Sequence, residues 1–260
     1  MNDAAFDLSP DLARIAAAYE CRKTSGCSGA QVFRLEKPGG TNLYLKIAER
    51  DNGALAAERE VLGWINGRLP APAVEWYGQS ELRSFLLTTE LSGVDAAQCS
   101  LLASPERLVC LLAEGLLRIH SLPINECPFD QRLAVKIEAA RVRVENGLVD
   151  ETDFDPKRLG RGAPDLYSEV LRFRPTQEDL VFTHGDYCFP NVIIANNAVS
   201  GFVDWGRAGI ADRYQDLALC ARSIAGNLGP EWAPAFFRHY GLTVINDEKL
   251  SFYELLDEFF

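Results

Sequence analysis

The stretch VFTHGDYCFPNVIIANNAVSGFVDWGR, residues 181–207, indicates the fold more directly than any other part of the chain. Within it, residues 192–195 and 199–203 are two apolar runs of strand length. They flank Asn196 and Asn197, and asparagine is a residue that tight turns favour. This pattern predicts a β-hairpin with polar side chains gathered where the chain enters and leaves it.

The polar residues at the mouth of this hairpin match the parts that phosphoryl transfer requires. Such a site needs an Asp near the acceptor hydroxyl, and an Asp with an Asn or a second Asp to bind Mg²⁺. In protein kinases the pattern H-R-D-x-x-x-x-N supplies two of these, and Asn191 follows Asp186 at the same spacing. Asp204 begins an Asp-Trp-Gly triplet where kinases have Asp-Phe-Gly. We interpret Asp186 as the base, and Asn191 and Asp204 as ligands of Mg²⁺.

The first half of the chain supplies candidates for holding a nucleotide. The glycine-rich loop SGCSG, residues 25–29, directly precedes a predicted strand, as a phosphate-covering loop does. Lys46 lies near the end of the alternating strand NLYLKIA, and Glu60 lies on the helix predicted next. A strand lysine oriented by a helix glutamate is the arrangement of kinases. We therefore expect Lys46 to hold the phosphates of ATP and Glu60 to pair with it.

Composition narrows the class of protein and of partner. The 260 residues are 47% hydrophobic and 24% charged, which is ordinary for a soluble globular chain. No apolar run approaches the roughly 18 residues that span a bilayer, and residues 1–10 lack the features of a signal peptide, so we expect a cytoplasmic protein. A net charge of −11 argues against nucleic acid or an anionic membrane as partner. It favours a polycationic small molecule.

The predicted elements divide the chain into two regions. Residues 1–91 contain most of the strands, including a hairpin formed by residues 30–37 and 41–48, and end in a connector. Residues 92–260 are mainly helical. We predict an α+β, protein-kinase-like fold with a small β-rich nucleotide-binding lobe, a larger helical catalytic lobe, and a cleft between them.

Each of these residues taken alone has an ordinary structural explanation. Lys46 resembles a solvated strand lysine, and Glu60 a solvated member of the run Glu-Arg-Glu. Asp186 and Asn191 are residue types that turns and helix caps also favour. Their common order and their predicted element types favour the kinase-like site over these separate explanations.

Three longer motifs add a resemblance to a known family. THGDYCFPNV, GFVDWGRAGIADRYQDLAL and the final YELLDEFF resemble the aminoglycoside phosphotransferases, and among them the 3′-phosphotransferases that confer kanamycin and neomycin resistance. The resemblance extends over essentially the whole chain. It implies MgATP-dependent transfer of the γ-phosphate to the 3′-hydroxyl of a polycationic antibiotic.

The resemblance implies roles for further residues near the nucleotide. It places Ser28 on the outer phosphates and the lysine on the inner ones. It places the ring of Tyr44 on adenine and the backbone of Glu90 and Leu91 along the adenine edge. Asp216 matches a buried residue that braces the loop of the catalytic aspartate.

For the substrate, the resemblance implies acidic groups that bind ammonium groups by charge-assisted contacts. The matching positions are Asp155, Asp257, Glu258 and, through a terminal carboxylate, Phe260, with Arg207 and Arg222 as supporting arginines. Four positions that are acidic in some relatives differ here, namely Pro156, Lys157, Ser223 and Gly226. Fewer carboxylates therefore face the antibiotic, while the residues for phosphoryl transfer are all present.

The residues alone leave two other functions open. A choline- or sugar-kinase-like enzyme would share the catalytic motifs and differ in the acidic end of the chain. A non-catalytic nucleotide-binding protein of the same fold usually lacks the lysine, the base or a metal ligand, and this sequence has candidates for all three. We expect a monomer or a weak dimer.

Overall fold

The computed structural model describes residues 9–24, 30–50 and 53–260. The loop expected to cover the phosphates, residues 25–29 with Ser28, lies outside the described residues. Among the described residues, no helix combines the length and the apolar character needed to cross a membrane.

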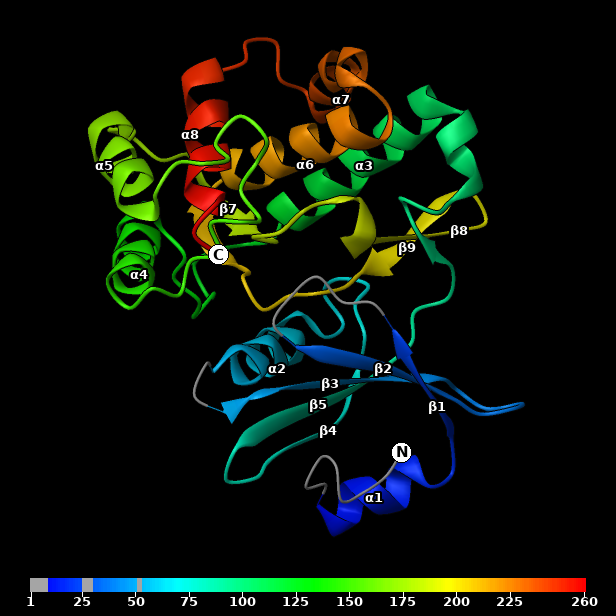
Figure 1. The fold of residues 1–260 in the computed structure, drawn as a ribbon. Helices are drawn as coiled ribbons and strands as arrows, with labels where there is room; N and C mark the ends of the chain where they lie inside the picture. The colour runs from blue at the N-terminus through cyan, green and yellow to red at the C-terminus, as the bar shows by residue number, and fades with distance from the viewer. Residues whose placement is uncertain (1–8, 25–29, 51–52) are drawn as a thin grey trace. The chain divides into compact units, whose positions relative to one another are not determined.

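The chain forms two compact units (Figure 1). Unit 1 consists of Met1–Gly93 with Ser200–Gly206, and unit 2 of Val94–Val199 with Arg207–Phe260. The sequence placed a single boundary between residues 91 and 92. The structure differs in assigning Ser200–Gly206 to unit 1, because this segment forms its contacts there.

Unit 1 is a five-stranded antiparallel sheet with two helices. Its elements are α1 (Pro10–Ala16), β1 (Glu20–Thr24), β2 (Gln31–Glu36), β3 (Leu43–Glu49), α2 (Ala54–Ile65), β4 (Val74–Gln79) and β5 (Arg83–Thr89). The strand order is β1-β2-β3-β5-β4, and β2 and β3 pair as the predicted hairpin. In this register Lys46 of β3 lies opposite Val32 of β2 and Leu86 of β5.

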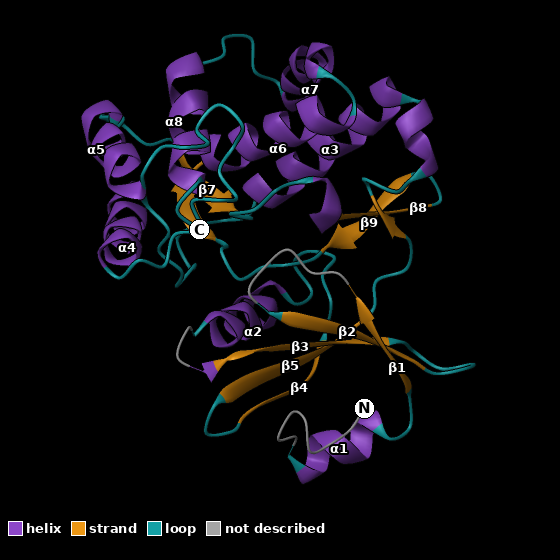
Figure 2. Ribbon diagram, viewed as in Figure 1, coloured by secondary structure: helices purple, strands orange, loops and turns teal. Residues whose placement is uncertain are grey.

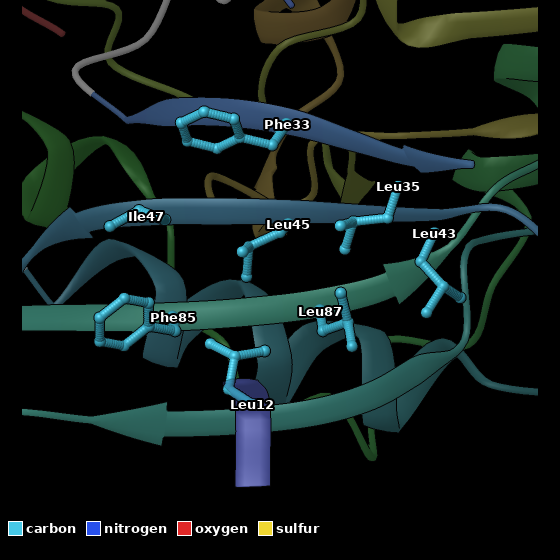
Figure 3. Packing of buried hydrophobic residues seen from close by; sticks show 8 residues of the cluster. All are labelled: Leu12, Phe33, Leu35, Leu43, Leu45, Ile47, Phe85 and Leu87. Atoms are coloured by element: carbon cyan, nitrogen blue, oxygen red, sulfur yellow. The ribbon is translucent and has the colours of Figure 1, made fainter. Parts of the chain in front are cut away.

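Alternation along the central strand separates the core of unit 1 from its polar face. On β3, Leu43, Leu45 and Ile47 are buried, and together with Leu12 of α1 they belong to one hydrophobic cluster (Figure 3). Successive strand residues point to opposite faces, so Tyr44 and Lys46 share the other face. Helix α2 packs on that face, where its Glu58 contacts Lys46.

Unit 2 is mainly helical and contains short strands (Figure 2). Its helices are α3 (Pro105–His120), α4 (Leu133–Glu145), α5 (Ala163–Phe173), α6 (Tyr214–Asn227), α7 (Ala233–Tyr240) and α8 (Asp247–Asp257), with 3₁₀ turns η3 (Ser100–Ala103), η4 (Phe189–Asn191) and η5 (Pro230–Trp232). Its strands are β6 (Val94–Asp95), β7 (Leu180–Thr183), β8 (Val192–Ala195), β9 (Ala198–Phe202), whose end passes into unit 1, and β10 (Gly209–Asp212).

The predicted hairpin at the centre of the diagnostic stretch is confirmed as β8 and β9. Asn196 and Asn197 between them have φ values of 51° and 58°. A two-residue turn of this kind requires positive φ at both positions, which asparagine tolerates better than most residues. Just before this hairpin, β7 pairs with β10, and the His-Gly-Asp triplet follows the end of β7.

Candidate active site

Lys46 lies between two carboxylates of unit 1. Its Nζ is 2.7 and 2.8 Å from the two carboxylate oxygens of Glu58, and 2.8 Å from Oδ1 of Asp204. Burial by itself lowers the pKa of a lysine, but these two carboxylates outweigh it and raise the pKa of Lys46 above its ordinary value. Lys46 is therefore a fixed cation. We call these three residues the Lys46 cluster.

The expected pairing of Lys46 with Glu60 is wrong, because its partner is Glu58. The Glu60 side chain is 60% exposed and its ion-pair contact is with the preceding arginine. Helix α2 buries Leu55 and Leu62, and residues three or four positions apart share a helix face. That phase turns Glu58 inward and Glu60 outward. The spacing of the apolar residues Leu55 and Leu62 already indicated the buried face in the sequence. Glu58 and Glu60 stand in the same Glu-Arg-Glu run, so residue type alone does not distinguish them.

Backbone contacts hold Asp204 beside Lys46. The N–H of Phe202 donates to the carbonyl of Pro70 at 3.0 Å, and the indole N–H of buried Trp205 donates to the carbonyl of Phe202 at 2.9 Å. Asp204 has a φ of 69°, a left-handed conformation that aspartate adopts more readily than most residues. The segment after β9 is thereby turned so that the Asp204 carboxylate meets Lys46.

The residues expected near adenine form a second polar group on the sheet. Tyr44 shares the face of Lys46, and Glu90 follows β5 at the connector. The N–H of Glu90 donates to the carbonyl of Asn42 at 2.9 Å, and its carboxylate accepts from the Asn42 amide at 2.7 Å and from Arg34 at 2.8 Å. Burial favours a higher pKa for Glu90, but these donors hold its pKa below the ordinary value. The side chain of Glu90 is thus structural.

The loop that carries Asp186 is anchored to helix α6. The buried carboxylate of Asp216 accepts hydrogen bonds from the N–H groups of His184 at 2.7 Å and Gly185 at 2.8 Å. It also lies 3.0 Å from Nε2 of His120 on α3. The expected bracing role of Asp216 is therefore confirmed. The loop gains two charge-assisted hydrogen bonds just before the catalytic candidate.

Glycine is required at position 185 for a steric reason. Gly185 has a φ of 84°, and a Cβ atom there would lie 2.0 Å from the carbonyl oxygen of Arg207. No side chain fits at that distance, and the backbone conformation itself favours glycine. The two segments of unit 2 that carry Asp186 and Arg207 consequently pass in direct backbone contact.

Asn191 orients the carboxylate of Asp186. Its Nδ2 donates to the backbone carbonyl and to Oδ2 of Asp186, both at 2.9 Å, which leaves Oδ1 of Asn191 as the atom suited to a metal. The Sγ of Cys188 lies 3.7 Å from Oδ1 of Asp186. Burial and that carboxylate raise the pKa of Cys188, so it is a neutral thiol. The oxygens of Asn191 in unit 2 and Asp204 in unit 1 are hard donors, the type that Mg²⁺ prefers.

Asp257 is bound by two arginines. Both Arg207 and Arg222 donate to its carboxylate. Burial alone would raise the pKa of Asp257, but the two guanidinium groups hold it below its ordinary value. The Cζ of Arg207 also lies 5.3 Å from the centre of the Phe260 ring. The structure thus brings together four residues that the sequence assigned to the substrate.

Asp155 and Glu258 share Arg158, a residue that the sequence reasoning missed. Its Nη1 is 2.9 Å from Asp155 and 2.7 Å from Glu258, and the N–H of Asp155 donates to Glu258 at 3.0 Å. Arg222 lies 3.7 Å from Asp155 and links this group to Asp257. We call three acids and three arginines together the arginine–carboxylate cluster: Asp155, Asp257, Glu258, Arg158, Arg207 and Arg222. The sequence signal for Arg158 was its place three residues after Asp155.

Comparison with known proteins places the chain in a family. A model of the phosphotransferase enzyme family matches residues 21–253. An aminoglycoside 3′-phosphotransferase of Niallia circulans is 39% identical over 237 residues, which are 90% of this chain and 90% of that protein. A crystal structure of aminoglycoside-3′-phosphotransferase of type VIII has a TM-score of 0.86 and 37% identity, covering 96% of this chain and 97% of that one.

A further solved structure contains ligands. Aminoglycoside phosphotransferase APH(3″)-Id from Streptomyces rimosus, in complex with ADP and streptomycin, has a TM-score of 0.85 and 28% identity, covering 100% of this chain and 98% of that one. These similarities confirm the kinase-like α+β fold, with a sheet in the first region and helices in the second. This protein therefore belongs to the phosphotransferase enzyme family and, within it, to the aminoglycoside 3′-phosphotransferases.

Proposed function

We propose that the protein transfers the γ-phosphoryl group of ATP to the 3′-hydroxyl of an aminoglycoside of the kanamycin or neomycin type, and so confers resistance to it. The observation that carries the proposal is the Asp186 loop. Its backbone is fixed by Asp216 and its carboxylate is oriented by Asn191. A base must be positioned before its pKa matters, and here both the backbone that leads to Asp186 and its carboxylate are held by hydrogen bonds.

In this proposal Asp186 acts on the acceptor hydroxyl. Phosphoryl transfer passes through a loose transition state, so positioning and electrostatic stabilisation supply most of the catalysis. Asp186 first accepts a hydrogen bond from the hydroxyl and thereby orients it toward the γ-phosphorus. It takes the proton as the new oxygen–phosphorus bond forms and the bond to the leaving ADP oxygen breaks.

The Lys46 cluster would hold the phosphates and the metal. Lys46 binds the α- and β-phosphates, and the buried Glu58 keeps its ammonium group in place. Asp204 and Asn191 would hold Mg²⁺, which neutralises the charge of the phosphates when bound. The Asp204 carboxylate that would serve the metal lies, through Oδ1, 2.8 Å from Nζ of Lys46, so the same side chain would face both the lysine and the metal.

The hydrogen bonds within the connector decide which backbone groups of Glu90 and Leu91 are available to bind the adenine edge. Because the N–H of Glu90 is already donated to Asn42, Glu90 would contribute its carbonyl and Leu91 its N–H. Tyr44 would contact the adenine ring from the sheet face. The contact of Ser28 with the outer phosphates stays a prediction.

The arginine–carboxylate cluster would receive the ammonium groups of the antibiotic. Asp155 is its most open acid at 22% side-chain exposure, against 12% for Asp257 and 3% for Glu258. An ammonium group therefore meets Asp155 and Asp257, while Glu258 and the arginines support them. The contact with Phe260, the cytoplasmic location and the monomeric or weakly dimeric state stay predictions.

The test is ATP consumption by the full chain with a panel of 2-deoxystreptamine antibiotics, choline or a peptide as acceptor. We expect turnover with the antibiotics only, and a loss of about 10²–10⁴-fold in kcat for Asp186→Asn with nucleotide binding retained. Asp165→Asn, at an exposed position on α5, is the matched control and should behave as wild type. Turnover with choline would favour a choline-kinase-like enzyme, and nucleotide binding without turnover a non-catalytic protein.

A further inference from the structure

Among the described residues of unit 2, one lysine is buried without a carboxylate contact. Lys136 on α4 is 4% exposed. In the part of the chain that the structure describes, its ammonium group forms neither an ion pair nor a hydrogen bond, and its closest recorded interaction is with the ring of Phe260, 4.7 Å from Nζ to the ring centre. Buried lysines are usually paired, so this one calls for a physical explanation.

Lys136 borders the residues proposed to meet the substrate. It lines a cavity of about 10 Å³ together with Arg207, Asp257 and Phe260, which is space for about one water molecule. Two cations approach the Phe260 ring, since the Cζ of Arg207 lies 5.3 Å from its centre as well. A cation bound near Asp257 would therefore enter the immediate surroundings of the Lys136 ammonium group.

The groups around Lys136 come from several elements. Those that interact with its charge are Arg207, Asp257 on α8, Asp216 on α6 and Asp186 in the catalytic loop, and Tyr253 on α8 lines the same cavity. Burial and Arg207 lower the pKa of Lys136 to about 7, although the acids oppose this change. Helix α5 also packs on α4, but the charge interactions of its Tyr167 are with other α4 residues.

The charge of the neighbouring cluster explains why the protonation state of Lys136 matters. The arginine–carboxylate cluster consists of three acids and three arginines paired with one another, so the formal charges of these six side chains cancel. A protonated Lys136 adds a positive charge beside it, which repels a polycation. A neutral Lys136 leaves the acids of this region, including Asp186, in excess.

We propose that Lys136 is a specificity-determining residue that gives up its proton when an aminoglycoside binds. The ammonium group of the ligand that lies near Asp257 replaces the charge of Lys136. The Nζ changes from NH₃⁺ to NH₂, and the proton passes to the buffer. Affinity for the antibiotic therefore increases as pH rises and Lys136 loses its proton in the free protein. This inference rests on the proposed function.

The first test compares proton release by calorimetry. Kanamycin is titrated into wild-type protein, Lys136→Met and Lys136→Arg at about pH 7, in two buffers of different ionisation enthalpy. The ammonium groups of free kanamycin titrate in the same way in all three experiments, so the difference in proton release between the proteins follows from position 136. We expect wild type to release a fraction of a proton more than either variant, up to about one half, because Lys136 is about half protonated in the free protein at this pH. Equal proton counts in wild type and Lys136→Met would overturn the proposal.

The second test uses the aminoglycoside KM on both sides of neutrality. At about pH 6 wild type should match Lys136→Arg, and at about pH 8 it should match Lys136→Met, with roughly a three- to tenfold KM difference between the two variants from the added charge. A KM ratio of wild type to Lys136→Met that is the same at both pH values would show a packing role alone. Lys37→Met, an exposed lysine of unit 1, is the control and should leave KM unchanged.

A measurement without substrate separates this inference from the proposed function. If wild type fails to bind kanamycin, the proposed function fails, but the titration of Lys136 is still visible in stability. A lysine with a lowered folded pKa is unfavourable while it must be protonated, so the urea midpoint of wild type should rise relative to Lys136→Met between about pH 7 and pH 9. A constant difference between the midpoints would show that Lys136 stays charged, and would overturn the inference independently.

Discussion

The Lys46 cluster and the arginine–carboxylate cluster use the same kind of contact and differ in charge balance. In unit 1 one lysine is shared by two acids, so the group carries one excess negative charge. In unit 2 three acids meet three arginines, so the group is neutral. The additional carboxylate in unit 1 can bind a metal ion. A neutral cluster mainly fixes geometry, and it attracts a polycation only if a neighbouring group loses positive charge.

The clusters also share one arrangement, in which a buried acid supports a more open one. In unit 1 the Glu58 side chain is 6% exposed and that of Asp204 41%. In unit 2 Glu258 is 3% exposed and Asp155 22%. Breaking a buried pair leaves an uncompensated charge in the interior, so the buried members should govern stability and position. The open members should govern ligand binding.

The largest effect should follow from removing the excess carboxylate of unit 1. Asp204→Ala should lower kcat by about 10³-fold or more, because a bound metal contributes several kcal/mol to the transition state and needs an anionic oxygen ligand. The measurement is the steady-state rate against Mg²⁺ concentration. Full activity, or activity indifferent to a chelator, would contradict the role of Asp204.

The next effect tests the buried member of the same cluster against its exposed neighbour. Glu58→Gln should raise the KM for ATP about ten- to hundredfold, because Lys46 loses charge-assisted hydrogen bonds worth about 1.5–3 kcal/mol. Glu60→Gln is the matched control on the same helix and should change neither KM nor the melting temperature. A larger effect at Glu60 than at Glu58 would mean that the pairing changes when nucleotide binds.

In unit 2 the open and buried acids should separate affinity from stability. Asp155→Asn should raise the aminoglycoside KM about tenfold, because one charge-assisted contact to an ammonium group is lost. Glu258→Gln should instead lower the free energy of unfolding by about 1–3 kcal/mol, because the buried Arg158 loses a partner. Both variants should leave the KM for ATP unchanged. Similar KM and stability changes in the two variants would remove the distinction between open and buried acids.

The smallest effect is a difference in pH dependence between the clusters. The lowered pKa of Asp257 contributes stability above its unfolded value of about 3.9, and this stability is lost as pH falls through the folded value. The raised pKa of Lys46 contributes stability below its unfolded value of about 10.4, which is lost as pH rises through the folded value. The two clusters should therefore weaken at opposite ends of the pH range.

Urea unfolding against pH measures this difference. Asp257→Asn should remove part of the acid-side slope and Lys46→Met part of the alkaline-side slope, each by at most about 1.4 kcal/mol per pH unit for a single proton. Thr152→Ser, at an exposed position of unit 2, serves as a neutral control. A change of slope at the same end of the range in both variants would contradict the assignment.

Local sequence patterns predicted much of this site because their geometry is local. The hairpin of β8 and β9 follows from two apolar runs and a pair of asparagines. The spacing of Asp186 and Asn191 places them within one short loop, where the side chain of one bonds the other. The helix phase that selects Glu58 over Glu60 was present in the sequence as well, in the spacing of Leu55 and Leu62 on α2.

The sequence by itself determined the fold class and the family motifs, and it supplied candidate residues for the chemistry. Only the tertiary structure decided which charges pair, because the partners are far apart in the chain. Lys46 meets Asp204 across 158 positions, and Arg158 meets Glu258 across 100. The sequence shows neither how deeply a charged residue is buried nor which charges lie near it. Burial and nearby charges set the pKa of the residue and its contribution to a site.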